Sequence, residues 1–338
     1  MLPFLGTDEW YIRLWDFPRL QLMVVMLGLL VAWLGLRPRT PAYWGLAVAL
    51  AAAAVWQATF ALAYLPVGPR KVASVESCPA GNSISVLNIN VFQDNREFHR
   101  TLDLVRRTDA DVVLFLETDE AWARALTPLL RTYRKVESVP IPNTYGMILM
   151  SRWPMTSRVR YRMQPDVPSI DATITMPSGD QIELYALHPE PPLPGDDSGE
   201  RDAELVMAGR DVRNSGRAAL VVGDLNDVAW SKTSQLFREV SGTADPRVGR
   251  GLYPTFNARY PLFRWPLDHL FVTPHWRVQE LNRLGKIGSD HFPIFFRVCL
   301  VEPADERLVA PAPAPGVRAE AREETTEGVR EDRAEGND

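Results

Sequence analysis

A set of acidic, amide and imidazole side chains stands at the ends of short apolar segments in the middle of the chain. The members are Asn90, Glu117, His188, Asp224, Asn226, Asp268, Asp290 and His291. Carboxylate and amide oxygens are the ligands that Mg²⁺ prefers, and carboxylates and imidazoles transfer protons near neutral pH. Taken singly, each residue has a simpler interpretation, because an Asn or Asp just past a strand is most often a turn residue. Their order along the chain as a set is much less easily produced by chance.

The segments that position these groups alternate between strand and helix. Residues 84–91 (ISVLNINV) and 111–118 (DVVLFLET) are continuous apolar runs, typical of strands with both faces covered. The run 169–188 alternates apolar and polar residues on both sides of PSGD, which predicts a hairpin. Helices are expected over about 96–110 and 200–213, and further strands over 218–227 and 292–300. This mixture predicts an α/β sandwich whose loops at one edge hold the site.

Two short motifs carry a family resemblance. GDLND at 223–227 and SDHFP at 289–293 are the most specific, and LNINV and FLET match more loosely. Over about residues 83–298 the chain resembles the endonuclease/exonuclease/phosphatase superfamily of metal-dependent phosphoesterases, and two apolar runs ahead of LDHLFVT and GSDH look like its membrane-anchored bacterial branch. The resemblance implies two packed mixed β-sheets flanked by helices, a four-layer α/β sandwich.

The resemblance also implies a metal site. Glu117 would be the main ligand of Mg²⁺, with Mn²⁺ as an alternative, and Asn90 and Asp290 would lie beside it. Asn88, two residues before Asn90 on the same strand face, is the other candidate for the metal-side amide. Asn90 is preferred because it adjoins the strand end.

The remaining residues of the set receive catalytic roles from the same resemblance. Asp224 would activate or orient the attacking water, and Asn226 would donate hydrogen bonds to phosphoryl oxygens. His291 would contact the phosphate, with Asp268 holding its imidazole in one tautomer and favouring the protonated form. His188 would be a second phosphate contact or a proton donor to the leaving group; the alternative is a solvated loop histidine before PEPPLP.

Two other residues near these motifs are assigned less weight. His269 follows Asp268 where relatives often have Tyr, so we expect a packing role and leave it out of the catalytic set. Arg152 is a further candidate phosphate contact. Hydrolysis of a phosphate ester needs a positioned water and neutralisation of charge on the phosphoryl oxygens, which this combination of residues supplies.

The chain has two cysteines, Cys78 and Cys299, which excludes a disulfide-dense fold. In the fold that the resemblance implies, the first and last strands are antiparallel neighbours, and this would bring the two thiols close together. A Cys78–Cys299 disulfide is expected if the domain faces an oxidising compartment. Two unrelated buried thiols are the alternative.

The first 68 residues have a different composition from the rest. Residues 20–36 are an uncharged run of 17 and residues 40–69 an uncharged run of 30, and about 20 apolar residues as a helix cross a bilayer core. We expect a transmembrane helical hairpin, with helices over about 20–36 and 42–67. A buried helix of a soluble domain and a cleaved signal peptide are the alternatives for the first run. Trp10, Tyr11 and Trp15 suit an interfacial aromatic segment over 1–19.

Charge divides the chain into parts. Arg37 and Arg39 in the connection between the runs favour a cytoplasmic loop and an extracytoplasmic catalytic domain. Arg13 and Arg19 before the first run, and Arg70 and Lys71 after the second, offset that bias. We expect a linker over 69–82, a catalytic domain over 83–301, and a disordered acidic tail over 302–338, which has 11 acidic and 5 basic residues.

The middle of the chain, 69–301, has 28 acidic and 28 basic residues. This balance disfavours a domain that grips nucleic acid by its phosphates. The expected function is therefore a membrane-anchored, divalent-metal-dependent phosphoesterase, with the lipid bilayer and a lipid-linked phosphate or other phosphodiester as partners. A nuclease of the same superfamily and a catalytically idle membrane scaffold are the alternatives, and no feature predicts a protein partner.

Overall fold

The middle of the chain contains two β-sheets packed face to face. The structure, a computed structural model, describes residues 9–36, 40–192, 198–301 and 312–334. One sheet has the order β10-β11-β1-β2-β4-β3 and the other β5-β6-β7-β8-β9. The strands of the first sheet are β1 (Ser83–Asn90), β2 (Val112–Leu116), β3 (Lys135–Val139), β4 (Met147–Ser151), β10 (Trp276–Arg283) and β11 (Ile294–Leu300). Those of the second are β5 (Met155–Arg160), β6 (Ser169–Thr175), β7 (Gln181–Leu187), β8 (Ala219–Asp224) and β9 (Asp268–Val272).

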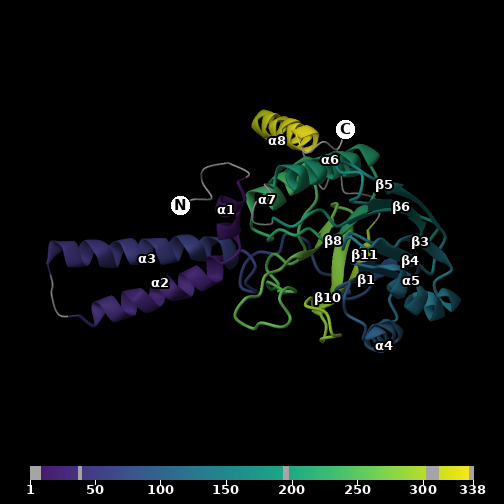
Figure 1. Ribbon diagram of the computed structural model, residues 1–338, viewed down its shortest axis with the longest axis horizontal. Coiled ribbons are helices and arrows are strands. Elements are labelled where there is room, and N and C mark those ends of the chain that lie inside the picture. The colour runs from purple at the N-terminus through teal and green to yellow at the C-terminus, as the bar shows by residue number, and fades with distance from the viewer. Residues whose placement is uncertain (1–8, 37–39, 193–197, 302–311, 335–338) are drawn as a thin grey trace.

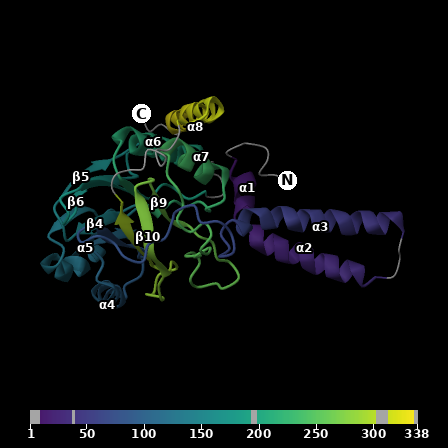
Figure 2. The same cartoon turned by 180° about the vertical axis from the view of Figure 1, so that it is seen from behind.

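Helices cover the outer face of each sheet (Figures 1 and 2). They are α4 (Phe98–Thr108), α5 (Glu120–Leu126) and the 3-10 helix η3 (Thr127–Arg131) on the first sheet, and α6 (Gly199–Ser215) and α7 (Lys232–Ser241) on the second. Alternation along β1 explains the layering, because Ile84 and Val86 pack between the sheets while Leu87 and Ile89 pack beneath α4 and α5. The prediction of two mixed sheets flanked by helices in four layers is confirmed.

Parallel pairing at two places brings the polar strand ends together. β1 pairs in parallel with β2, and β7 with β8. Asn90 lies opposite Leu116, so Glu117 follows immediately beside it, and Asp224 lies opposite Asp268 across the antiparallel β8–β9 pair. Because the carboxyl ends of parallel strands lie at one edge of a sheet, these two parallel pairings place the polar side chains that end the strands at one rim.

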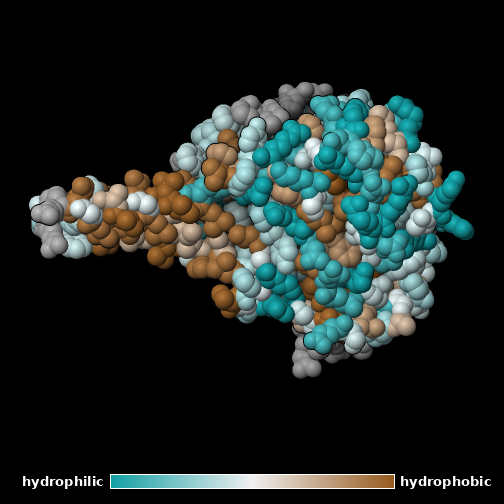
Figure 3. All heavy atoms as spheres, turned by 90° about the horizontal axis from the view of Figure 1, so that it is seen from below, coloured by the Kyte–Doolittle hydropathy of each residue, from teal (hydrophilic) through white to brown (hydrophobic). Residues whose placement is uncertain are grey.

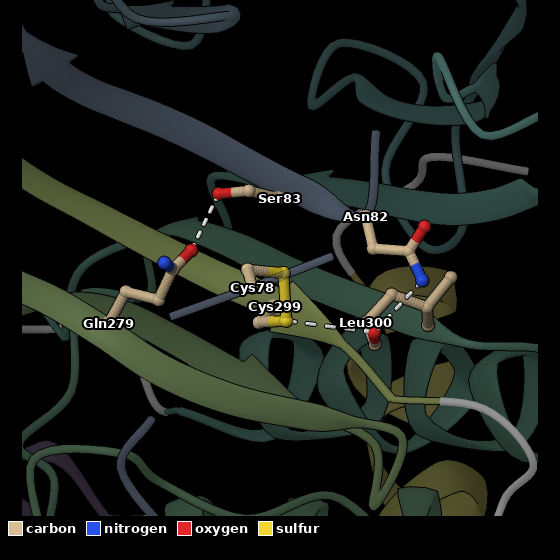
Figure 4. Close-up of a disulfide and its surroundings, with 6 residues drawn as sticks. All are labelled: Cys78, Asn82, Ser83, Gln279, Cys299 and Leu300. Atoms are coloured by element: carbon tan, nitrogen blue, oxygen red, sulfur yellow. Dashed lines mark hydrogen bonds between the residues drawn. A yellow bond between two sulfur atoms is a disulfide. The ribbon is translucent and has the colours of Figure 1, made fainter. Parts of the chain in front are cut away.

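The segment just before the first strand is joined covalently to the last strand. β1 pairs antiparallel with β11, and Ser83 lies opposite Cys299. Cys78 and Cys299 form a disulfide with a Cα–Cα distance of 5.7 Å (Figure 4). The predicted linker is packed here, since the Val75 amide donates to the Val278 carbonyl on β10 at 3.0 Å. The structure therefore selects the disulfide over two unrelated thiols.

Two apolar helices extend from one end of the part that contains the sheets (Figures 1 and 3). They are α2 (Arg19–Leu34) and α3 (Pro41–Leu62), preceded by the short α1 (Trp10–Arg13) and the 3-10 helix η2 (Leu14–Asp16). Most of their apolar side chains face outward, with Val31 71% exposed, so α2 is not the buried helix of a soluble domain. Of the described residues, α3 alone is by itself long and apolar enough to cross a membrane; α2 qualifies only together with α1 and η2, at a bend of 71°.

The expected disordered tail is wrong for residues 315–334. They form α8 (Pro315–Ala334), which packs on α6 (Figure 1). Val317 and Ala321 contact an apolar patch of α6 and α7, and a Cβ added at Gly328 would lie 2.5 Å from the Ala203 Cβ. The tail has few large apolar residues, but small ones at helical spacing let two helices approach closely, so composition alone does not exclude a packed helix. Residues 302–311 and 335–338 of the predicted tail lie outside the described residues.

Candidate active site

Asn90 and Glu117 form the first part of the site, at the ends of β1 and β2. The Asn90 amide donates to the Glu117 carboxylate at 2.7 Å and to the Asp224 carboxylate at 3.1 Å. The Gln93 backbone amide donates to the second oxygen of Glu117 at 3.1 Å. Burial raises the pKa of Glu117, and the hydrogen bond from Asn90 opposes this rise. Glu117 has φ of +59°, so the strand ends abruptly at this residue.

His291 forms the second part, between two carboxylates. Its Nδ1 lies 2.8 Å from the Asp268 Oδ2, and its Nε2 lies 3.4 Å from the Asp224 Oδ2. Burial by itself lowers the pKa of His291, but the charges of Asp224 and Asp268 outweigh it and raise this pKa to about 10. The side chain is therefore an imidazolium at neutral pH, with both ring nitrogens as donors.

The two asparagines of β1 have separate partners. Asn88 donates to the Asp268 Oδ1 at 2.9 Å, whereas Asn90 donates to Glu117 and Asp224. Asn88 thus holds the carboxylate of Asp268, which in turn contacts His291, and it belongs to the site although it was expected only as an alternative metal ligand. Its spacing from Asn90 already indicated a place in the site, because residues two apart on a strand share a face.

Asn226 and His188 flank this centre. The Asn226 backbone amide donates to Asp224 at 3.0 Å, and its side chain donates to the Pro189 carbonyl at 2.9 Å. His188 is buried, which excludes the solvated loop alternative. Burial lowers the pKa of His188 to about 4, so it is neutral at pH 7. Its Nδ1 has no hydrogen-bond partner within the described ranges. The Tyr145 ring packs against the His188 ring, with the two ring centroids 5.9 Å apart.

Asp290 completes the predicted set. It is partly exposed, and its charge contributes to raising the pKa values of both Glu117 and His291. Ser289 donates to the Asn90 carbonyl at 2.8 Å and accepts from the His291 amide at 2.9 Å, which pins this loop to the end of β1. All eight predicted residues therefore lie at one rim of the double sheet.

The site has an excess of negative charge that suits a divalent cation. Four carboxylates, those of Glu117, Asp224, Asp268 and Asp290, surround one imidazolium. One atom each of Asp224, Asp268 and His291 lies within 4.8 Å of the others, but both nitrogens of a protonated His291 face these carboxylates and offer no lone pair to a metal. The oxygens of Glu117, Asn90 and Asp290 are the better fit to a hard cation.

Two residues beside the site behave as packing or structural groups. His269 is buried, with ring nitrogens 2.7 Å from the Arg247 guanidinium and 2.9 Å from the Asp227 carbonyl, in keeping with the packing role expected of it. The suggestion that Arg152 contacts phosphate is wrong. Arg152 follows β4, which is antiparallel to β2, so it lies at the opposite edge from Glu117 and pairs with Asp109.

The family of the chain follows from its sequence. The model of the Endonuclease/Exonuclease/phosphatase family matches residues 86–291, more than half of the chain. The chain belongs to this family. Members of the Endonuclease/Exonuclease/phosphatase family are metal-dependent hydrolases of phosphate esters, so the predicted class of enzyme is confirmed. A search of curated proteins finds no match.

Solved structures of the Endonuclease/Exonuclease/phosphatase family share the fold at low identity. A protein from Beutenbergia cavernae has a TM-score of 0.53 and 18% identity, with coverage of 65% of this chain and 72% of that chain. D. rerio TDP2 complexed with a single-strand DNA product has a TM-score of 0.54 and 17% identity, with coverage of 64% of this chain and 98% of that chain. The human Nocturnin catalytic domain with bound sulfate has a TM-score of 0.54 and 17% identity, with coverage of 69% of this chain and 98% of that chain. Identities this low bear on the fold alone.

Proposed function

We propose that this protein is a membrane-anchored, divalent-metal-dependent phosphoesterase that hydrolyses a lipid-linked phosphate ester. One observation supports the proposed catalysis. At the rim of the double sheet, side-chain contacts link Glu117 to Asn90, Asn90 to Asp224, and Asp224 to His291. A single site there has oxygen ligands for a cation, a carboxylate that can accept a proton, and an imidazolium.

Each side chain then has a defined task in hydrolysis. Glu117, with Asn90 and Asp290, would hold Mg²⁺ or Mn²⁺, which when bound neutralises charge on the phosphoryl oxygens. Asp224 orients the attacking water and accepts its proton as the new P–O bond forms and the ester P–O bond breaks. The imidazolium of His291 and the N–H groups of neutral His188 and Asn226 stabilise the charge that develops on the phosphoryl oxygens. The leaving oxygen departs with the bonding electrons and is protonated by solvent.

The position of the site supports a membrane substrate. The segment η2 leads directly into the apolar α2, and Trp230, from the loop after β8, donates to the Asp16 carbonyl of η2 at 2.8 Å. The buried Arg13 of α1 pairs with Asp202 of α6 at 2.8 Å. These buried contacts hold the catalytic rim next to the helix pair, and the balanced charge of residues 69–301 gives no net attraction to nucleic acid.

The disulfide supports an extracytoplasmic placement. Disulfides persist in oxidising compartments and are rare in the cytosol. A catalytic domain outside the cytoplasm also agrees with a cytoplasmic position of Arg37 and Arg39 between the two helices.

The test is an activity comparison on the detergent-solubilised full chain. Bis-nitrophenyl phosphate, a phospholipid and plasmid DNA are assayed with Mg²⁺, with Mn²⁺ and with chelator. We expect metal-dependent turnover of the first two. Glu117→Gln should lose about 10²-fold or more in turnover, whereas Glu120→Gln, at an exposed position of α5, should retain it. Turnover that chelator leaves unchanged would refute the metal mechanism. Preference for DNA would indicate a nuclease, and no turnover of any substrate would indicate a scaffold.

A further inference from the structure

An apolar groove of about 420 Å³ adjoins the catalytic rim. Two of its lining residues, Asn226 and His291, belong to the site, and the other nine are apolar or proline side chains. These nine residues come from the segment 14–18, which includes η2, from Pro191 and Pro192, and from the segment 256–267. The groove therefore joins the catalytic groups to the segment that leads into α2.

A series of ring contacts forms one wall of this groove. The His291 ring lies 4.9 Å from the Phe256 ring, which stacks on Trp265 at 6.2 Å. Trp265 contacts Phe17 edge to face at 5.7 Å. Backbone hydrogen bonds from Thr255 and Phe256 to the Trp265 carbonyl, both 3.0 Å, keep the two ends of this segment together. The wall is thus continuous from the catalytic imidazolium to η2.

The loop 259–264 extends the apolar surface toward the helices. Leu262 is 78% exposed and Phe263 56% exposed, and the Gln21 side chain of α2 donates to the Leu262 carbonyl at 3.0 Å. Arg259 and Arg264 flank these residues in the sequence, and their guanidinium groups lie over the rings of Phe92 and Phe292. Exposed apolar tips beside cations are typical of a surface that lies in a bilayer interface with anionic lipids. Figure 3 shows the hydrophobic surface continuing from the helix pair onto the adjoining part of the domain.

We propose that this groove binds a hydrocarbon chain of the substrate next to the scissile phosphate, with the loop 259–264 lying in the bilayer interface. The inference rests on the proposed function and adds to it the binding site for the apolar part of the substrate. A single nucleic acid strand binds a positively charged groove that follows its backbone, in addition to stacking its bases on aromatic rings. The described residues that line this groove include no Lys or Arg, and their polar groups lie only at the catalytic end. A hydrocarbon chain fits that distribution, because it gains from burial and needs no partner.

A series of nitrophenyl phosphate diesters with ethyl, hexyl and decyl groups tests the proposal. The full chain is assayed in nanodiscs with Mg²⁺, and nitrophenol release gives kcat/KM. For the wild type we expect an increase of about two- to fourfold per added methylene until the groove is filled. The double variant Leu14→Ser/Phe263→Ser should equal the wild type on the ethyl diester and fall about tenfold or more below it on the decyl diester. Leu130→Ser, an exposed residue of η3 on the far side of the domain, is the matched control.

Longer alkyl groups also partition more strongly into the bilayer, but this effect is the same for all variants. A difference between variants therefore reports binding in the groove. Equal dependence on alkyl length in the double variant, the control and the wild type would overturn the proposal. If the double variant does not fold, Phe263→Ser alone gives the same test, because that side chain is mostly exposed. A wild type without metal-dependent turnover of the ethyl diester would instead refute the proposed function.

Discussion

The disulfide offers the sharpest quantitative prediction about the stability of this protein. Cys78 and Cys299 are separated by 221 residues in sequence, so the bond closes almost the whole catalytic domain into one loop of the unfolded chain. Chain-entropy arguments for a loop of this length predict a stabilisation of about 5 kcal/mol, whereas measured disulfides typically contribute about 2–4 kcal/mol. Either value is a large fraction of the roughly 5–15 kcal/mol that keeps a domain folded.

The measurement is thermal unfolding of the catalytic domain in the full chain, with and without a reductant, at one scan rate. For a domain of this size, about 1 kcal/mol corresponds to a shift in Tm of roughly 2–4 °C, so we expect reduction to lower the Tm by about 5–15 °C. The same reductant should leave the Cys78→Ser/Cys299→Ser variant unchanged, since it has no bond to break.

Two results would contradict this reasoning. Free thiols at both positions in protein made in an oxidising compartment, detected by non-reducing mass mapping, would show that the pairing is wrong. A mapped bond whose reduction moves the Tm by less than about 2 °C would show that the unfolded state is not constrained by the loop as the entropy argument assumes.

Three further predictions concern the site and the tail. The variants Glu117→Ala, Asp224→Asn and His291→Ala each remove a charge or a proton-transferring group, so each should reduce turnover about 10²-fold or more. Their circular dichroism spectra should be unchanged, and a collapsed spectrum would show that these residues are structural. Burial depresses the pKa of His188 to about 4, so the unfolded chain binds a proton there that the native chain does not, and stability should fall as pH decreases from about 6.5 to 4. His188→Asn should show a smaller decrease over that window in denaturant titrations, and an identical pH dependence would refute the assignment. Gly328→Leu should displace α8 from α6, because even a Cβ does not fit there; limited proteolysis should cleave the tail sooner while turnover stays unchanged, and equal protection would place α8 elsewhere.

The sequence alone predicted the catalytic chemistry and the sheet architecture. Asn90, Glu117 and Asp224 each end or follow a continuous apolar strand, and such strands, covered on both faces, are recognisable from composition and length. The motifs GDLND and SDHFP around Asp224 and Asp290 then gave the resemblance to the superfamily, and the resemblance implied the two packed sheets.

Two predictions were wrong because each considered one segment without the segments that pack or pair with it. The segment 315–334 has a polar composition, yet Val317 and Ala321 become buried against α6 and α7, a surface that no property of the tail itself predicts. Arg152 follows a strand as Glu117 does, but β4 runs antiparallel to β2, so the end of β4 is at the opposite edge. Strand direction depends on long-range pairing and is not encoded in either strand separately.

Tertiary structure decided the division of labour within the site. Sequence placed Asn88 and Asn90 on one strand face. The parallel pairing of β1 with β2 brought Asn90 beside Glu117, and the approach of the second sheet brought Asn88 to Asp268. The protonation of His291 likewise depends on the charges of Asp224 and Asp268, which come from the adjacent strands β8 and β9 and outweigh the opposing effect of burial on its pKa. Residue type and order can predict which groups a reaction needs, because those are local properties. Distances, burial and charge balance arise only when separated segments are packed together, and they determine what each group does.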